Sequence, residues 1–187
     1  PEVANKILVT MGGGDQKNIT FKVLEAINQI NIEGLEIKIV IGSSNRNLDS
    51  LKETAKNSKH RVELLQNVFS MPEVMDWADL AVSAGGSTCW ELFYMKVPAI
   101  LIILADNQKG VVETLCKREI CFTLGWFNKM SMETIHRNLL LLINDSENRK
   151  NSISIGSELI DGQGVSKVII NMMDNLHPGL LPLGVVP

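Results

Sequence analysis

The sequence has few of the residues that build metal centres and disulfide frameworks. Its 187 residues include three cysteines and three histidines, with no Cys-x-x-Cys and no Asp-x-Asp pair. Zinc and magnesium sites need such ligands at short spacing, so we expect no metal site and no other cofactor. Cys89, Cys116 and Cys121 are expected to be reduced, mostly buried thiols.

The sequence also lacks a basic excess and a long apolar run. Its 18 Lys and Arg are scattered and are outnumbered by 21 Asp and Glu, for a net charge of −3. This pattern argues against nucleic-acid binding. The longest apolar stretch, Val97 to Ala105, falls well short of the roughly 20 residues of a spanning helix. We therefore expect a soluble, cytoplasmic protein with no membrane span.

What the sequence does contain is a regular alternation of strand-like and helix-like segments. Short aliphatic and β-branched segments, apolar on both faces as buried parallel strands are, predict six strands: Lys6 to Thr10, Leu35 to Ile41, Arg61 to Leu65, Leu80 to Ser83, Ala99 to Leu104 and Cys121 to Leu124. Segments with helical periodicity lie between them: Thr20 to Ile30, Leu48 to Asn57, Met71 to Trp77, Thr88 to Met95 and Gly110 to Lys117.

This alternation predicts an α/β fold with a doubly wound, Rossmann-like parallel sheet of about six strands. After the sixth strand come three more helical segments, Met132 to Ile143, Glu147 to Ile160 and Val165 to Leu176, which are expected to cover the sheet or to pack on a neighbour. Residues 177–187 carry three prolines and two glycines among leucines and valines. They are expected to form an apolar tail that is not helical.

Two predicted strand-to-helix loops are rich in glycine. Gly12, Gly13, Gly14 and Asp15, with Asn18 close behind, follow the first strand; Gly85, Gly86, Ser87 and Thr88 follow the fourth. Ligands of open parallel sheets bind beyond the carboxyl ends of the strands, where glycine lets backbone N–H groups approach an anion and helix N-termini add free donors. Both loops suit a phosphate or diphosphate. A tight turn capped by Asn18 or Thr20 would explain the first loop equally well.

The first loop matches neither of two common nucleotide-binding motifs. A Walker A loop needs Gly-Lys-Ser/Thr, which is absent. A dinucleotide fingerprint needs a third glycine where Lys17 stands and an acidic residue after the second strand, where residues 41–44 have none. ATP hydrolysis of the P-loop type and NAD binding are therefore disfavoured.

Four polar residues complete the candidate site. Glu91 is one turn into the helix after the second glycine loop, where a carboxylate can accept two hydrogen bonds from a ribose diol. Thr88 and Glu91 also have capping-box spacing, which is a structural alternative. Asp106, Asn107 and Gln108 follow the fifth strand. They could hold a sugar or diphosphate, or cap the next helix.

Together these segments resemble the C-terminal domain of GT-B nucleotide-sugar enzymes. Within that group they are most similar to the UDP-sugar hydrolases of pseudaminic-acid biosynthesis, and more loosely to the lipid-linked GlcNAc transferases of peptidoglycan synthesis. The chain departs from the pattern at Gly14, where the family usually has Ser, and at Gln16, where it often has Pro. The similar stretches lie within about residues 6–170 and are residues 12–15, 18–20, 78–92, 97–98, 105–108 and 159–164.

The resemblance implies that residues 1–176 are the nucleotide-sugar-binding, C-terminal half of a GT-B fold, with UDP or a UDP-sugar in its cleft. It implies that both glycine loops hold the diphosphate, that Glu91 binds ribose, and that Asn107 lies at the reaction centre beside Asp106 and Gln108. The implied reaction is metal-independent hydrolysis of a UDP-2,4-diacetamido-2,4,6-trideoxy sugar in surface polysaccharide or nonulosonic-acid biosynthesis. Sugar transfer to an acceptor, and a binding subunit without activity, are the alternatives.

The resemblance also implies a missing half. The family's N-terminal domain, which supplies the catalytic histidine, is absent from this chain, which begins at Pro1 directly before a strand. We expect that domain in cis or as a partner subunit, and we expect the chain alone to bind without turnover. Apolar surface left open by its absence is expected to favour a homodimer of the fragment.

Overall fold

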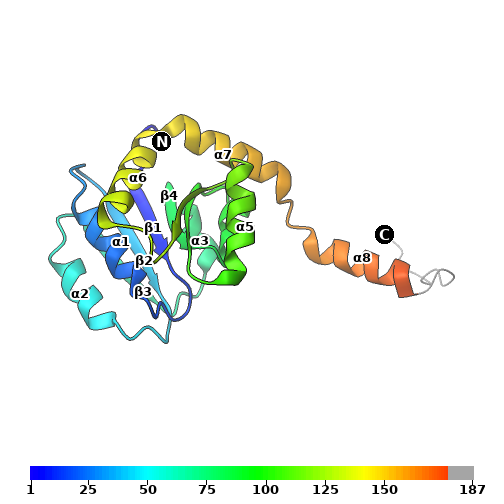
Figure 1. Ribbon diagram of the computed structural model, residues 1–187, viewed down its shortest axis with the longest axis horizontal. Helices are drawn as coiled ribbons and strands as arrows, with labels where there is room; N and C mark the ends of the chain where they lie inside the picture. Colours follow the sequence, from blue (N-terminus) through cyan, green and yellow to red (C-terminus); the bar gives the residue numbers. More distant parts are fainter. Residues whose placement is uncertain (177–187) are drawn as a thin grey trace.

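The computed structural model describes residues 1–176; the predicted tail, residues 177–187, lies outside the described part. Its centre is one sheet of six strands in the order β3-β2-β1-β4-β5-β6, with every pairing parallel (Figure 1). The strands are β1 (Lys6–Thr10), β2 (Glu36–Ile41), β3 (Arg61–Gln66), β4 (Leu80–Ala84), β5 (Ala99–Ile103) and β6 (Phe122–Trp126). The predicted doubly wound α/β fold is confirmed.

Helices cover both faces of the sheet. On one face α1 (Ile19–Asn28), α2 (Leu48–Lys56) and α6 (Met132–Asn144) bury their apolar stripes, and on the other face α3 (Met71–Asp76), α4 (Thr88–Tyr94) and α5 (Asp106–Lys117) bury theirs. Successive side chains of a strand point to opposite faces, so Ile7 and Val9 join the first core and Leu8 joins the second. All residues of β4 and β5 are buried, as expected of central parallel strands.

The start of α5 differs from the sequence-based prediction. The helix begins at Asp106 rather than Gly110, because Ala105 is extended and the side chain of Gln108 folds back to accept a hydrogen bond from the N–H of Leu104 at 2.9 Å. Gly110 lies inside the helix, where a glycine costs about 1 kcal/mol relative to alanine. Asp106, Asn107 and Gln108 therefore form the first turn of a helix and not a loop.

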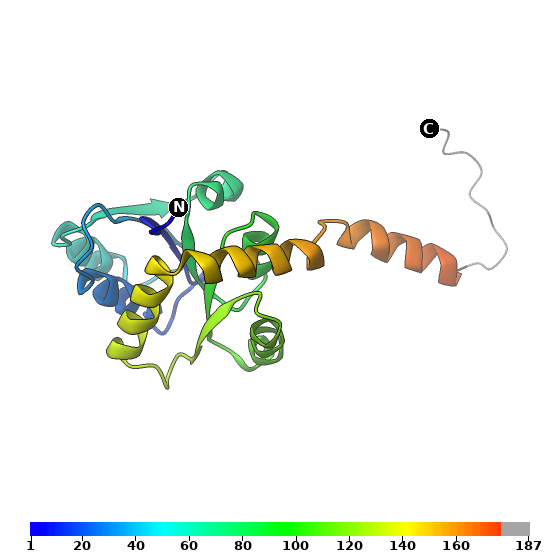
Figure 2. The same ribbon diagram turned by 90° about the horizontal axis from the view of Figure 1, so that it is seen from above.

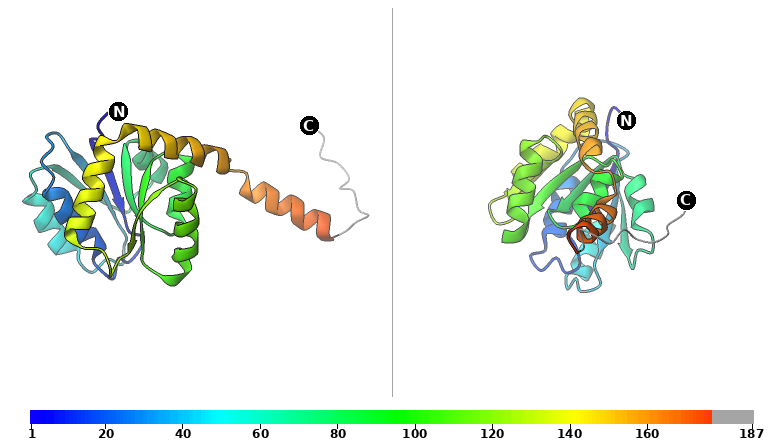
Figure 3. Two further views of the ribbon diagram at one scale, coloured as in Figure 1. Left: turned by 45° about the horizontal axis from the view of Figure 1, so that its top comes forward. Right: turned by 90° about the vertical axis from the view of Figure 1, so that its right-hand side faces the viewer.

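The last two helices leave the compact part of the chain. Helix α7 (Ser146–Leu159) runs from α6 along the edge of the sheet and contacts α4, and α8 (Gly164–Leu176) then projects away from the body (Figures 2 and 3). Helix α8 does not cover the sheet, and the apolar side chains of its residues 165–173 are exposed. Within residues 1–176, no helix has the length and apolar character that crossing a membrane requires.

Candidate functional site

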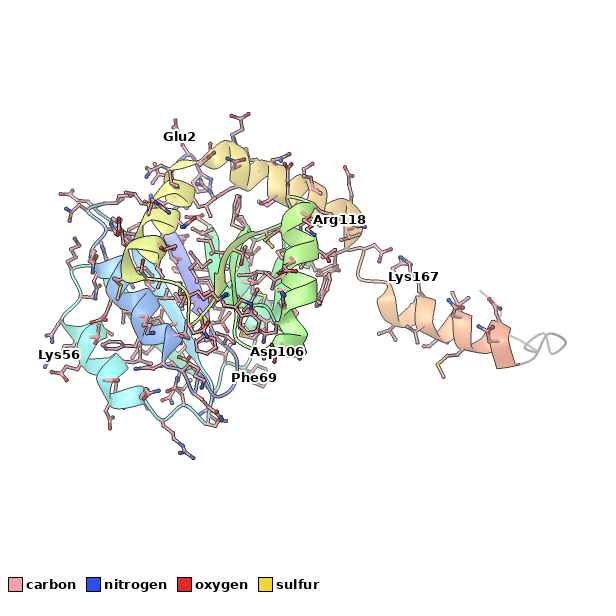
Figure 4. All side chains as sticks on the ribbon, viewed as in Figure 1. Glu2, Lys56, Phe69, Asp106, Arg118 and Lys167 are labelled. Carbon is pink, nitrogen blue, oxygen red and sulfur yellow. The ribbon has the colours of Figure 1, made fainter. Side chains whose placement is uncertain are left out.

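The strand order reverses between β1 and β4, which are direct neighbours in the sheet. Thr10 pairs with Ser83 and Ala84 pairs with Ile102, so the loops after β1, β4 and β5 leave the sheet side by side. Asp106, labelled at the lower end of α5 in Figure 4, marks this carboxyl-terminal end of the sheet. In doubly wound sheets such a reversal is where ligands bind.

The loop after β1 is shaped by three left-handed backbone conformations, at Gly12 (φ 80°), Asp15 (φ 37°) and Asn18 (φ 53°). Asp15 is buried, and its two carboxylate oxygens accept hydrogen bonds from the N–H groups of Ile19 (2.8 Å) and Thr20 (2.9 Å). The side chain of Asp15 therefore caps α1. In the alternative interpretation Asn18 or Thr20 capped this turn; Asn18 does stand at the N-cap position, but its side chain makes no capping hydrogen bond. Two donors that an anion could have used at this helix start are already occupied.

Gly12 and Gly13 nevertheless face open space. Both are exposed, and a Cβ added to either would meet no atom within 4 Å. The loop after β2 packs against this loop. A Cβ added to Gly42 would overlap the backbone of Gly13. Ser44 Oγ also donates a hydrogen bond to the Gly13 carbonyl at 2.8 Å. The sequence does not indicate this support, because residues 41–44 predict only a loop without an acidic residue.

The loop after β4 is packed tightly on one side and has free donors on the other. Gly85 is buried, and a Cβ there would overlap Val112 of α5, so only glycine fits. The N–H groups of Cys89 and Trp90 bond back to the carbonyls of Gly86 (3.2 Å) and Ser87 (3.1 Å). Within residues 1–176, the N–H groups of Gly86, Ser87 and Thr88 have no such partner. These three donors stand next to the reversal in strand order.

Glu91 is an exposed carboxylate in the first turn of α4. The alternative that Thr88 and Glu91 form a capping box is not realised, because α4 has no side-chain capping hydrogen bond at its N-terminus. Within the described residues Glu91 also belongs to none of the ion pairs. Its acceptor oxygens are thus available to a ligand.

The first turn of α5 joins the site from the neighbouring strand. Asp106 and Asn107 are exposed, and the Nε2 of Gln108 lies 3.8 Å from the Cβ position of Gly86. Since the Oε1 of Gln108 is bonded to the N–H of Leu104, its NH₂ group is the part left to face the second glycine loop. The structure therefore places the three predicted loops at the carboxyl ends of neighbouring strands and brings Gln108 against the second glycine loop.

Phe69 is a residue that sequence analysis did not single out. It lies between β3 and α3 with a fully exposed ring, at the same lower edge as Asp106 in Figure 4. An exposed aromatic ring at a ligand-binding edge is able to stack on a planar group. In the sequence, Phe69 is a single aromatic residue in a loop after a strand, and this pattern does not show whether its ring is exposed.

Titratable groups elsewhere do not extend the site. Among residues 1–176 no three His, Cys, Asp or Glu side chains gather as metal ligands would. His60 is buried just before β3, with Nε2 at 3.1 Å from the carbonyl of Ile27. Burial lowers the pKa of His60 although that hydrogen bond opposes the shift. It lies at the amino end of its strand, opposite the candidate site.

Comparisons with known sequences agree with this arrangement. Residues 6–155 match the glycosyltransferase family 28 C-terminal domain. The chain is 25% identical over 169 residues to the spore coat polysaccharide biosynthesis protein SpsG of Bacillus subtilis, covering 90% of this chain and 50% of that protein. It is 34% identical over 100 residues to a UDP-N-acetylglucosamine–N-acetylmuramyl-(pentapeptide) pyrophosphoryl-undecaprenol N-acetylglucosamine transferase of Carboxydothermus hydrogenoformans, covering 52% of this chain and 27% of that protein.

Solved structures show the same fold. Acinetobacter baumannii MurG superposes with a TM-score of 0.73 at 15% identity, over 91% of this chain and 50% of that chain. The UDP co-structure of S. aureus MnaA superposes with a TM-score of 0.70 at 12% identity, over 92% of this chain and 46% of that chain. The chain thus spans at most about half the length of these relatives. With residues 6–155, most of its length, matched by the family model, the chain belongs to the glycosyltransferase family 28 C-terminal domains.

Proposed function

We propose that this chain is the nucleotide-sugar-binding half of a two-domain GT-B enzyme and that its ligand is UDP or a UDP-sugar. The observation that carries the proposal is the set of free backbone donors at Gly86, Ser87 and Thr88, one helical turn before the unpaired carboxylate of Glu91. Donors and acceptor at this spacing suit a diphosphate attached to a ribose. The relative from Carboxydothermus is named for a UDP-sugar, and the MnaA structure contains UDP.

In this proposal the diphosphate lies between the two glycine loops. The N–H groups of residues 12–14 and 86–88 stabilise its charge without a metal ion, while the N–H of Gly85 is occupied by the carbonyl of Ile102 at 3.0 Å. Asp15 and Asn18 shape the first loop. The carboxylate of Glu91 accepts a hydrogen bond from each of the two ribose hydroxyl groups. Phe69 offers its exposed ring to the base.

Asn107 is the residue that we propose at the reaction centre. Its exposed amide, with Asp106 and Gln108 on either side in the first turn of α5, provides hydrogen bonds to the sugar or to the diphosphate. We propose that the general acid or base comes from a second domain, joined in cis or present as a partner subunit. The chain alone then binds but does not turn over.

For the whole enzyme we propose hydrolysis of a UDP-2,4-diacetamido-2,4,6-trideoxy sugar in surface polysaccharide or nonulosonic-acid biosynthesis. The likeness of residues 78–92 and 105–108 to the pseudaminic-acid hydrolases supports this choice. Transfer to an acceptor fits the same residues, and the Carboxydothermus relative is a transferase by name. Assay of the enzyme with both domains, following free sugar against glycosylated acceptor, distinguishes the two.

The test is calorimetric titration of the chain with UDP in the absence of Mg²⁺. We expect binding that Glu91→Ala weakens at least about tenfold, a loss of roughly 1.4 kcal/mol, because the ribose loses its charged acceptor. Glu91→Gln keeps the shape of the side chain but not its charge, and its UDP affinity is expected to lie between those of wild type and Glu91→Ala. NADH is expected not to bind.

A matched control is Glu53→Ala, which removes an exposed glutamate from α2 and should leave UDP affinity unchanged. A folded protein that does not bind UDP would contradict the proposed ligand. Equal affinity in wild type and Glu91→Ala would contradict the ribose assignment alone.

A further inference from the structure

Two cysteine side chains lie against each other at the end of α5 that is farther from the candidate site. The sulfur atoms of Cys116 and Cys121 are 3.2 Å apart. Cys116 is half-buried in the last turn of the helix, and Cys121 is buried directly before β6. Arg118, between them in sequence, marks the upper end of α5 in Figure 4, while Asp106 marks the lower end.

The turn that ends α5 creates this contact. Glu119 has a left-handed backbone (φ 59°), its N–H bonds to the carbonyl of Cys116 at 3.0 Å, and the N–H of Ile120 bonds to the carbonyl of Leu115 at 3.1 Å. This is the hydrogen-bond pattern of a Schellman motif, which reverses the chain after a helix. The reversal returns residue 121 to the side of residue 116, so a local turn fixes the pair.

The two thiols are chemically unequal. The contact with the Cys121 sulfur lowers the pKa of Cys116, whereas the same contact, together with burial, raises the pKa of Cys121. The third cysteine, Cys89, is buried, and burial raises its pKa to about 11. Cys116 is also the one of the three that is only half-buried, whereas Cys89 and Cys121 are buried. Because an accessible thiolate is the reactive form, Cys116 is the nucleophile among the three, and Cys121 is positioned to react with it next.

We propose that Cys116 and Cys121 form an oxidisable dithiol that a peroxide converts to an intramolecular disulfide. The Cys116 thiolate attacks one peroxide oxygen and breaks the O–O bond, which gives Cys116 sulfenic acid and a hydroxide that takes up a proton to become water. The Cys121 thiol then attacks the Cys116 sulfur; the S–O bond breaks and a second water leaves. The two thiols lose two electrons and two protons in total, and the peroxide is reduced.

The test uses the whole chain with hydrogen peroxide, followed by alkylation of the remaining thiols and trypsin digestion without reductant. Trypsin cleaves after Lys117 and Arg118, which lie between the two cysteines, so the disulfide joins two peptides that are otherwise separate. We expect this linked pair in wild type and in Cys89→Ala, and we expect added reductant to separate it. The intact chain should lose two hydrogen atoms in mass.

Single variants test the order of the steps. In Cys121→Ser, dimedone should label a sulfenic acid at Cys116, and in Cys116→Ser it should leave Cys121 unlabelled. In the untreated wild type, we expect Cys116 to be alkylated at least about tenfold faster than Cys89, because its thiolate fraction is larger. Circular dichroism checks that each variant is folded.

Three results would overturn the proposal: a disulfide that includes Cys89, covalent dimers in place of the intramolecular link, or Cys116 oxidised to sulfinic acid while Cys121 remains a free thiol. Each is read on the wild-type chain. The outcome is therefore decided even if a serine variant does not fold.

Discussion

The carboxylate of Asp15 lies close to where the proposed diphosphate would sit, although the two carry the same sign of charge. Both of its oxygens are occupied by N–H groups at the positive end of the α1 dipole, and the side chain is buried. Such bonds stabilise a carboxylate and reduce its effect on neighbouring anions. The role of Asp15 is thus to hold the loop that presents Gly12 and Gly13.

Asp15→Ala is expected to lower the free energy of unfolding by about 1–2 kcal/mol, the usual effect of removing a helix cap. Asp15→Asn, which keeps one acceptor oxygen, should cost less. Urea denaturation followed by circular dichroism measures both. Asp49→Ala, at an exposed aspartate in the first turn of α2, is the control and should change the stability by less than about 0.5 kcal/mol. An unchanged midpoint in Asp15→Ala would show that α1 does not depend on this cap.

Single residues of the site were predictable to different degrees. Gly85 and Glu91 stood out in the sequence because strand, glycine and helix follow one another directly. The capping role of Asp15 did not, since it depends on left-handed backbone at Asp15 and Asn18. Gly42 and Phe69 were missed because their positions matter only through contact with another loop or through exposure at the sheet edge.

At the scale of elements, α7 is held by a buried arginine more than by an apolar face. The buried residues of this helix are Arg149, Ser152 and Gly156. The guanidinium of Arg149 donates hydrogen bonds to the carbonyls of Leu142 and Ile143 in the last turn of α6, and to those of Pro1 (2.8 Å) and Glu2 (3.0 Å). One side chain thus caps α6, anchors α7 and secures the start of the chain.

Arg149→Ala is expected to destabilise the fold by roughly 3 kcal/mol, because several buried carbonyl groups lose their donor at once. Arg149→Lys keeps the charge but not the planar guanidinium group, and should be destabilised by only part of the amount expected for Arg149→Ala. Thermal and urea denaturation give both values. Arg137→Ala, at an exposed position of α6, should be close to neutral. A loss equal to that of Arg137→Ala would mean that water replaces the guanidinium at these carbonyls.

Periodicity located most elements to within one or two residues, because the buried strands and amphipathic helices carry a strong pattern. The exceptions follow from other forces. The start of α5 was placed four residues late because Gln108 bonds back to the N–H of Leu104. The surface against which α8 packs could not be predicted. An amphipathic pattern shows that a helix has an apolar face, but it does not show what covers that face.

At the scale of the whole molecule, α8 is the described helix that projects from the body, although Lys167 in its first turn pairs with Asp161 at 2.6 Å. It extends from the body in Figures 2 and 3, and Gly162, with φ 72° and packed against Tyr94, turns the chain into it. Its apolar residues are exposed: Val165, Val168, Ile169, Ile170, Met172 and Met173. Exposed apolar surface of this kind marks a site of association, and the chain is at most about half the length of the relatives compared above.

This chain is expected to self-associate through α8 as its concentration rises. Ile169→Glu with Met173→Glu places two charges on one side of the helix, four residues apart, and should return the protein to a monomer in sedimentation velocity. Asn171→Glu, which adds a charge among polar residues of the same helix, should leave the association unchanged. If the wild-type chain sediments as a monomer at every concentration, the exposed side of α8 does not bind a second copy. If all three proteins associate equally, the contact lies elsewhere on the molecule. Because α8 is remote from the glycine loops, the double variant should bind UDP as wild type does, so association and ligand binding can be measured independently.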